Sequence, residues 1–360
     1  MNYLDTVTWK EINETPEILG GIQSANSEVM KELLDAIKKS NATNFIVAAR
    51  GASNNAVTFF KYVLEINSKY TVGFSAPSVI TLYRGKLDYS NSIILGCSQS
   101  GMAEDVLEVL KKGNEQGALT VAVTNDLSSP VAKEAKFVLN CNAGEEKSVA
   151  ATKTFNSQLY VLSWLAFELS GMKEELFILK NLKGELLHCI PEIDELTTKF
   201  VEKFKDMENG FVISRGLSYA VALEMALRLQ ETCRLNVTGY AGSDFYHGPL
   251  SMLNKETPVI LFCARNYVDE ELRTIIRTDQ IKLVEKILGF NAPVLLVTND
   301  SLIRDRFKRC NYAFINVSMP EELSIFIFSL FAQMFSCKIA CLKGFNPDDS
   351  DAISKVTITK

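Results

Sequence analysis

The sequence has no long runs of like charge and no Cys-x-x-Cys pair. Its 38 basic and 43 acidic residues are interspersed along 360 residues and give a formal net charge of −5. A basic stripe that could follow a nucleic-acid backbone or an anionic membrane is missing, so we expect neither partner. The eight cysteines lack the Cys-x-x-Cys spacing typical of zinc or redox sites, and most of them lie far apart. We expect reduced, mostly buried thiols, and we predict no metal and no cofactor.

Apolar segments of targeting length are also missing. The N-terminal stretch MNYLDTVTWKEINETPEIL contains acidic residues and no apolar core of signal-peptide length. We also expect no uninterrupted apolar stretch long enough to span a bilayer. These features predict a cytoplasmic protein. The composition, 47% apolar and 22% charged, is globular, and a chain of 360 residues is long enough for two domains.

Short apolar runs rich in Val, Ile and Phe alternate with segments of helical period. This alternation is typical of βαβ units and a mostly parallel sheet, so the predicted fold class is α/β. One predicted helix covers residues 27–39, where apolar side chains recur on one face. The predicted strands of the first half are residues 45–49, 92–96, 119–123 and 137–140.

Three segments of the first half have counterparts in the second half, in the same order: two recur in sequence, and the ILGCSQS segment has a counterpart in position only, as a strand end. They are VAARGAS (47–53) with VISRGLS (212–218), ILGCSQS (94–100) with VILFCAR (259–265), and VTND (123–126) with VTND (297–300). The first two pairs share a shift of 165 residues, and the third has a shift of 174. A common order at nearly one offset predicts a duplicated α/β domain, divided as 1–190 and 191–360. We expect the linking segment, roughly 155–208, to be helical and rigid.

Two strand-to-helix turns contain the residue types that bind an oxyanion. Ser98, Gln99 and Ser100 directly follow a predicted strand, and Gly101 allows the backbone to turn before the next helix. Hydroxyls, an amide and the N–H groups of a helix N-terminus together favour phosphate binding. Ser53 lies in a second such turn and could close the same site. The alternative interpretation is that both are ordinary turns with capping serines.

A predicted helix at 221–234 carries Glu224, Arg228 and Glu231 in one stripe, at positions i, i+4 and i+7. A surface ladder of ion pairs is the simpler interpretation. The repeat favours a functional one, because this helix starts at the ligand-binding edge of the second sheet. His247, one of only two histidines, lies in a loop with a Gly-Pro pair and is a candidate general acid or base.

At these residues the chain resembles the double-SIS-domain sugar isomerases, and specifically the isomerase half of glucosamine-6-phosphate synthase. The motifs that carry the resemblance are EINETP (11–16), SQSG (98–101), AGEEKSVAATKTF (143–155), ALEMALRLQE (222–231), YAGSDFYHGPL (240–250) and SKVTIT (354–359). The resemblance implies two tandem flavodoxin-like, doubly wound SIS domains. It also implies a phosphorylated sugar as substrate and a homodimer whose active sites are shared between subunits.

The resemblance assigns roles to individual positions of this sequence. It implies a proton shuttle between C1 and C2 at Glu231 and a ring-opening histidine at His247. Further catalytic positions are Glu224 and Lys355. The implied substrate-binding positions are Ser53, Ser98, Gln99, Ser100, Val149 and Arg228.

Departures from the family pattern limit the activities to expect. The chain has Ala103 and Ala151 where the synthase has hydroxyl residues, and Arg228 where it has a lysine, so no Schiff base is expected there. The sequence begins where the isomerase half begins, and we therefore expect no glutamine-hydrolysing domain. The leading hypothesis is an isomerase or deaminase of a 6-phosphorylated hexose or amino hexose. The alternatives are a deglycase of a fructosamine-type 6-phosphate and a non-catalytic sugar-phosphate sensor.

The second half departs from the first at its own phosphate-loop positions. Its matching residues are Cys263, Ala264 and Arg265. We therefore expect no second phosphate site of the same geometry.

Overall fold

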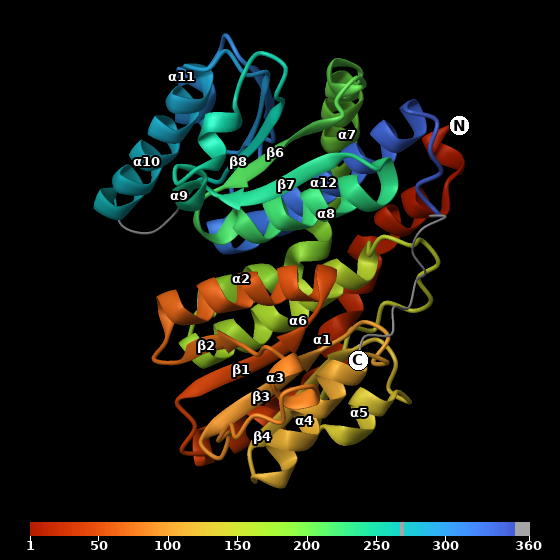
Figure 1. Ribbon diagram of the computed structural model, residues 1–360, viewed down its shortest axis with the longest axis vertical. Helices are drawn as coiled ribbons and strands as arrows, with labels where there is room; N and C mark the ends of the chain where they lie inside the picture. The colour runs from red at the N-terminus through yellow and green to blue at the C-terminus, as the bar shows by residue number, and fades with distance from the viewer. Residues whose placement is uncertain (267–269, 350–360) are drawn as a thin grey trace. The chain divides into compact units, whose positions relative to one another are not determined.

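A computed structural model describes residues 1–266 and 270–349, so Lys355 and the SKVTIT motif lie outside the described residues. The chain divides into two compact units. The first unit contains residues 14–147 and 151–183, and the second contains residues 1–13, 148–150 and the described residues from 184 on. Each unit holds one five-stranded parallel sheet with helices on both faces, which confirms the predicted α/β class (Figure 1). The boundary at 190/191 stays a prediction.

The sheet of the first unit has the strand order β2-β1-β3-β4-β5. All four strands predicted for the first half are confirmed. β2 has no apolar run in its sequence, TVGF, and is largely exposed, which is why the pattern does not predict it. The strands are β1 (Asn44–Ala49), β2 (Thr71–Phe74), β3 (Ser92–Cys97), β4 (Leu119–Thr124) and β5 (Phe137–Asn140), and the helices are α2 (Gly51–Asn67), α3 (Ser78–Thr81), α4 (Glu104–Glu115), α5 (Pro130–Glu134) and α6 (Lys153–Ser170).

Helices cover both faces of this sheet, so its central strand β3 is buried along its whole length. On one face lie α2 and α6, and on the other lie α3, α4 and α5 (Figure 1). Phe45 and Phe60 meet edge to face on the α2 side, with ring centroids 5.3 Å apart. Ile94 belongs to the core cluster that includes Val109 and Leu110 of α4 on the other side. The carboxyl ends of the strands are left for loops.

Two long helices, α1 (Val7–Lys39) and α7 (Lys173–Phe204), have residues in both units. α1 contains the predicted helix 27–39, and Met30, Leu33 and Ile37 are buried on its apolar face. α6 and α7 confirm that the linking segment is helical. They are separated at Gly171, whose left-handed backbone (φ 70°) ends α6. The rigidity of this segment stays a prediction.

The sheet of the second unit, in the order β10-β9-β8-β6-β7, has the same topology as the first. Strand register agrees with both sequence shifts. At the shift of 165, the pair Ala49 and Cys97 in the first sheet corresponds to the pair Ser214 and Phe262 in the second. The next strand follows at the shift of 174, since Val123 pairs with Cys97 and Val297 pairs with Phe262. The elements are β6 (Asn209–Ser214), η2 (Gly216–Ser218), α8 (Tyr219–Cys233), β7 (Asn236–Ala241), α9 (Gly242–Phe245), η3 (Pro249–Met252), β8 (Val259–Cys263), α10 (Glu270–Leu288), β9 (Val294–Thr298), α11 (Ser301–Arg306), β10 (Asn311–Phe314) and α12 (Glu321–Leu342), preceded by η1 (Tyr3–Asp5).

α12 corrects one expectation from the sequence. It is 22 residues long with a mean hydropathy of 1.9 in its most apolar window, so among the described residues one helix is apolar enough to cross a membrane. However, 94% of that window is buried inside the protein. Phe328 of α12 packs against Phe262 of β8, with ring centroids 5.4 Å apart. The run is apolar all round because α12 is a core helix.

The thiols behave as predicted. All eight cysteines are free and seven of them are buried, Cys310 being the partly buried one. Burial raises the pKa of Cys97 and of Cys263 to about 12. These two strand-end thiols are therefore protonated and unreactive at neutral pH.

Candidate functional site

The predicted phosphate loop lies where the strand order of the first sheet reverses. β1 is flanked by β2 and β3, and the chain leaves β1 into α2 and leaves β3 into α4. The N-cap residues of these helices, Arg50 and Ala103, make no side-chain cap hydrogen bond. Neither N-cap side chain therefore occupies the first-turn N–H groups that these two helices direct to one sheet edge. Ligands of open α/β sheets bind at such a switch point.

Residues 98–101 form a tight turn at this edge. The Ser98 N–H donates to the Val123 carbonyl at 3.0 Å, and the Gly101 N–H donates to Ser98 Oγ at 3.2 Å. Gly101 has φ +64°, and a Cβ there would lie 2.0 Å from Ser129 Oγ. Only glycine fits this position, because both the backbone conformation and the space exclude a side chain.

The side chains of the loop differ in exposure. The backbone carbonyl of Gln99 points toward the end of β4 and accepts from the Asn125 N–H at 3.0 Å. Ser100 Oγ accepts from the Met102 N–H at 3.3 Å. Ser98 is buried, whereas Gln99 and Ser100 are partly exposed. The backbone is thus held from the inside while the amide and hydroxyl of Gln99 and Ser100 face the surface.

Ser53, from the first turn of α2, lies beside the end of β3. It is 7% exposed, and its Oγ accepts from Nε2 of Gln158 in α6 at 2.9 Å. Its hydrogen bond to Cys97 partly offsets the effect of burial on the pKa of that thiol. The structure therefore brings Ser53 to the strand that ends in the 98–101 loop, and its role in binding stays a prediction. Gln158, which holds it, was not predicted, because nothing in its helical sequence distinguishes it.

Arg50, the N-cap residue of α2, forms an ion pair with a buried carboxylate of α4, that of Asp105. Arg50 Nε lies 2.7 Å from Asp105 Oδ2, and the side chain of Asp105 is only 2% exposed. Arg50 itself is 53% exposed. Arg215, at the repeat position in the second unit, pairs with Asp279 at 2.8 Å. In the first unit this pair keeps a guanidinium near the phosphate loop and neutralises an acid that would repel an anion.

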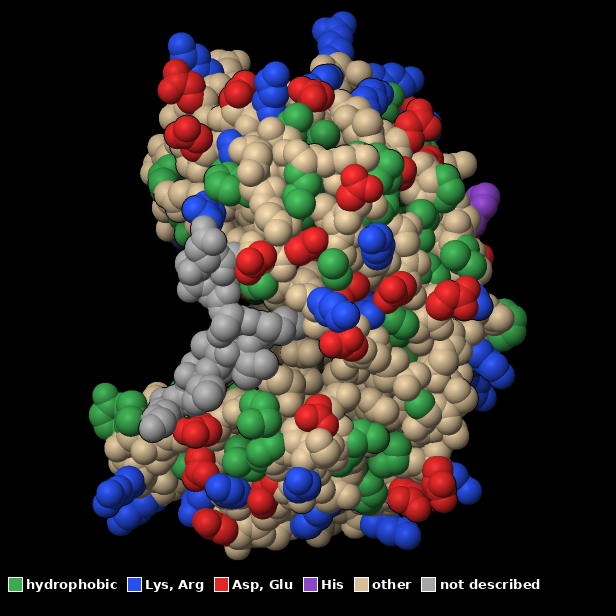
Figure 2. All heavy atoms as spheres, turned by 90° about the vertical axis from the view of Figure 1, so that its right-hand side faces the viewer, with side chains coloured by type: hydrophobic (Ala, Val, Ile, Leu, Met, Phe, Trp, Pro, Cys, Tyr) green, Lys and Arg blue, Asp and Glu red, His purple; other side chains and the backbone are tan. Residues whose placement is uncertain are grey.

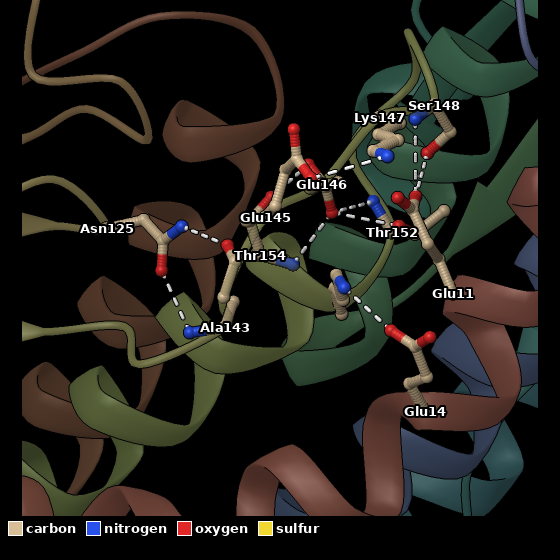
Figure 3. A network of polar contacts seen from close by, with 12 residues as sticks. Glu11, Glu14, Asn125, Ala143, Glu145, Glu146, Lys147, Ser148, Thr152 and Thr154 are labelled. Atoms are coloured by element: carbon tan, nitrogen blue, oxygen red, sulfur yellow. Dashed lines mark hydrogen bonds and ion pairs between the residues drawn. The ribbon is translucent and has the colours of Figure 1, made fainter.

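The motif at 143–155 is organised by Glu146, which is 7% exposed (Figure 3). Its carboxylate accepts from the N–H groups of Thr152 and Thr154, both at 2.9 Å, and from their hydroxyls at 2.8 and 2.7 Å. These donors lie at the start of α6, so Glu146 caps the positive end of that helix. Lys153, in the same turn, pairs with Glu14 at 2.6 Å.

Asn125 joins this motif to the phosphate loop: its side chain bonds the motif, as Figure 3 shows, and its N–H bonds the loop. Its Nδ2 donates to the Gly144 carbonyl at 2.7 Å, and its Oδ1 accepts from the Ala143 N–H at 2.8 Å. Its backbone N–H donates to the backbone carbonyl of Gln99. Neither Glu146 nor Asn125 was predicted as part of the site. The repeated VTND segment was the available signal for Asn125, since it marks the same strand end in both sheets.

Val149, a predicted substrate-binding position, belongs to the second unit. Its N–H donates to the Asp348 carbonyl at 3.3 Å. The neighbouring Ser148 is fully buried, and its hydroxyl donates to Glu11, as Figure 3 shows. The backbone N–H of Val149 is therefore already used, and its role in binding stays a prediction.

The stripe on α8 is not a surface ladder. Glu224 is 1% exposed and Arg228 is fully buried, while Glu231 is partly exposed. Exposed ion pairs contribute little, but a buried guanidinium requires nearby charged or polar partners. Glu224 and Glu231 lie one helical turn to either side of Arg228. This places one partly accessible carboxylate at the end of a buried charged row.

His247 lies in the predicted loop, in a turn between α9 and η3, and is exposed. Its N–H donates to the Asp244 carbonyl at 3.0 Å, and Gly248 follows with φ 137°. The backbone of the turn is thus fixed while the imidazole remains open to solvent. The structure does not test its catalytic role.

The second sheet has a different arrangement at the edge that matches the phosphate loop. Ser218, at the repeat position of Ser53, is 1% exposed. Beside Gly216 lies Glu321, the first residue of α12, which accepts from Asn266 Nδ2 at 2.6 Å. Burial raises the pKa of Glu321 to about 8, and the charge of Glu322 adds to this effect. The serine loop of the first unit is not repeated here.

On the face drawn in Figure 2, basic and acidic side chains are interspersed, without a large patch of one sign. Within residues 1–266 and 270–349, no group of three or more His, Cys, Asp or Glu side chains is placed to hold a metal ion.

Comparisons with known proteins agree with the fold of two parallel sheets. The SIS domain family matches residues 38–167 and 203–343, one segment for each sheet. A glutamine–fructose-6-phosphate aminotransferase (isomerizing) of Clostridium perfringens is 31% identical over 96% of this chain, which spans 58% of that relative. The C-terminal domain of glucosamine-fructose-6-phosphate aminotransferase from Francisella tularensis superposes with a TM-score of 0.83 at 24% identity, covering 96% of this chain and 98% of that one. A glucosamine-6-phosphate deaminase from Thermotoga maritima shares the fold, with a TM-score of 0.73 at 21% identity and coverage of 98% and 100%. The chain belongs to the SIS domain family.

Proposed function

We propose that this protein is a phosphosugar isomerase that acts on a 6-phosphorylated hexose or amino hexose. The observation that carries the proposal is the phosphate loop at 98–101. It combines hydroxyl side chains, a glycine-dependent turn and two helix N-termini without side-chain caps at the switch point of the first sheet. A helix N-terminus contributes about 0.3–2 kcal/mol to anion binding, so the hydrogen bonds of the loop must supply the rest.

The proposed chemistry is proton transfer between C1 and C2. His247 opens the sugar ring by moving a proton between O1 and the ring oxygen. Glu231 then removes the C2 proton and returns a proton to C1, through an enediol or, for an amino sugar, an enolamine. An amino sugar leaves this step as a ketimine, which consumes one water and releases one ammonia to give the ketose phosphate.

The α8 stripe supports Glu231 as the shuttle. A base that takes and returns a proton works best when its two protonation states are nearly balanced. Glu231 shares its stripe with the fully buried guanidinium of Arg228, one turn away, and with a second carboxylate, Glu224. An arginine does not form a Schiff base, so we assign Arg228 an electrostatic role and no covalent one.

Ammonia release, the deglycase reaction and a purely sensory role differ in measurable products. The test is a coupled assay for fructose 6-phosphate and ammonia with glucose 6-phosphate, glucosamine 6-phosphate and a fructosamine 6-phosphate. We expect turnover of phosphorylated sugars only, with ammonia formed from glucosamine 6-phosphate. Ser98→Ala with Ser100→Ala should raise KM about tenfold or more. Equal use of phosphorylated and free sugar would contradict the loop's role, and tight binding without turnover would favour the sensor.

Two further features belong to this proposal. The family resemblance implies a homodimer with shared active sites, which light scattering of the purified chain would test. The cytoplasmic location predicted from the sequence fits an enzyme of phosphorylated metabolites, because such substrates are made inside the cell.

A further inference from the structure

A pocket of about 250 Å³ lies at the carboxyl end of β8 and β9 in the second unit. Arg265 follows β8, Asp300 follows β9, and Arg273 and Arg277 come from α10, the helix that connects these strands. The equivalent edge of the first sheet carries the phosphate loop, since Arg265 corresponds to Ser100 in the repeat. The second unit thus has a cavity at the place where the first has its anion loop, with different side chains around it.

Among the described residues, three arginines line this pocket together with two acids, Glu270 and Asp300, so this part of the lining has a net charge of +1. Asp300 is 3% exposed, and both of its carboxylate oxygens are used within the protein. Oδ2 accepts from Arg277 Nε at 2.7 Å, and Oδ1 accepts from the Leu302 N–H at 2.8 Å. Its negative charge is therefore compensated by the fold and repels an incoming anion only weakly.

The arginines are held in place by the same elements. The Arg265 N–H donates to Asn299 Oδ1 at 2.8 Å, which ties the end of β8 to the end of β9. On α10, Arg273, Arg277 and Gln280 lie at i, i+4 and i+7, and Gln280 Nε2 donates to the Ala264 carbonyl at 3.2 Å. This stripe therefore faces the strand edge. Arg265 and Arg273 are partly exposed, so part of each side chain can be reached from solution, although the Nε atom of each is buried.

We infer that the pocket formed by Arg265, Arg273 and Arg277 binds the phosphate group of a small phosphorylated metabolite. Planar guanidinium forks match the oxygens of a phosphate and bind it in pairs, which a serine loop cannot do. A volume of about 250 Å³ holds a phosphate with a small organic part and is too small for a nucleotide or a polymer. This site differs from the phosphate loop in donors and in geometry, and it does not depend on the isomerase proposal.

The test uses the full chain with Ser98→Ala and Ser100→Ala, which weakens the first site. Isothermal titration with inorganic phosphate in low-salt buffer should still show one site per chain. Adding Arg265→Gln and Arg273→Gln should weaken that binding by about tenfold or more, because two charge-assisted contacts are lost. Arg309→Gln, which removes an exposed arginine outside the pocket lining, is the matched control and should leave binding unchanged.

A second measurement covers the case in which the double arginine variant does not fold. In the chain with intact arginines, phosphate should protect Arg265, Arg273 and Arg277 from phenylglyoxal, as read by peptide mass spectrometry, and should leave Arg309 unprotected. Absence of phosphate binding in the Ser98 and Ser100 background would overturn the inference. So would unchanged binding after the arginine substitutions, or equal modification of all four arginines with and without phosphate.

Discussion

Glu146 offers a direct test of how the 143–155 motif supports the first unit. Its buried carboxylate receives four hydrogen bonds of 2.7–2.9 Å from Thr152 and Thr154, at the start of α6. Glu146→Ala removes the acceptor and leaves two N–H groups and two fully buried hydroxyls without it. We expect the beginning of α6 to fray, because its first N–H groups have no other side-chain cap.

The size of the effect follows from these contacts. A hydrogen bond to a charged group contributes about 1.5–3 kcal/mol, but such contributions are not additive. The substitution also removes the cost of burying a carboxylate, and threonine hydroxyls can turn to other acceptors. We therefore expect Glu146→Ala to lower the free energy of unfolding of the first unit by about 3 kcal/mol. Glu146→Gln keeps one carbonyl acceptor and should lose about half as much.

Urea unfolding followed by circular dichroism measures these differences. Glu145→Ala is the control, because Glu145 is 77% exposed and makes only a 3.4 Å ion pair with Lys147. Gln158 lies further along α6 and holds Ser53, so Glu146→Ala should also raise KM for a phosphorylated substrate, while Glu145→Ala should not. Unfolding free energies of the two alanine variants within about 0.5 kcal/mol of each other would refute the capping role.

Two predictions concern other carboxylates. Glu231→Gln should preserve folding and sugar-phosphate affinity, but it should lower turnover by about 10²–10⁴ and stop exchange of the substrate's C2 hydrogen with solvent deuterium. The control, Glu202→Gln at an exposed position, should change neither turnover nor exchange. Exchange at the wild-type rate in Glu231→Gln would remove Glu231 from the mechanism. Burial raises the pKa of Glu321 from 4.5 to about 8, so the folded state binds the proton of this carboxyl more tightly than the unfolded state does. The resulting contribution to the free energy of unfolding is complete below pH 4.5 and is lost as the pH rises to about 8. Glu321→Gln should therefore flatten the decline of unfolding free energy over this range, by about 1 kcal/mol per pH unit, and parallel pH profiles of the variant and the wild type would contradict it.

Local patterns in the sequence were sufficient for the architecture. Fully buried strands such as β3 and β9 are continuous apolar runs because a parallel sheet is covered on both faces. The glycines of the repeated Arg-Gly turns, Gly51 and Gly216, both have left-handed backbones, at φ 52° and 70°. The repeat was readable because each copy requires the same glycine at the same strand end.

Contacts between distant segments could not be read in this way. Nothing local distinguishes Glu146 from Glu145, yet one is buried beneath a helix end and the other faces solvent. Glu224 and Arg228 have the spacing of a surface ion pair, and only the packing of α8 decides that they are buried. α12 has the composition of a membrane span, and its place beside β8 makes it a core helix.

The sequence by itself determined the α/β class, the duplication, the turn at 98–101 and the family resemblance, because these depend on periodicity and on residues close together in the chain. Tertiary structure alone decided which side chains support that loop and which arginines share a pocket. Gln158 meets Ser53 across 105 residues, and Asp300 meets Arg277 across 23. Such pairings depend on how helices are laid against the sheet, and that placement leaves no local pattern in the sequence.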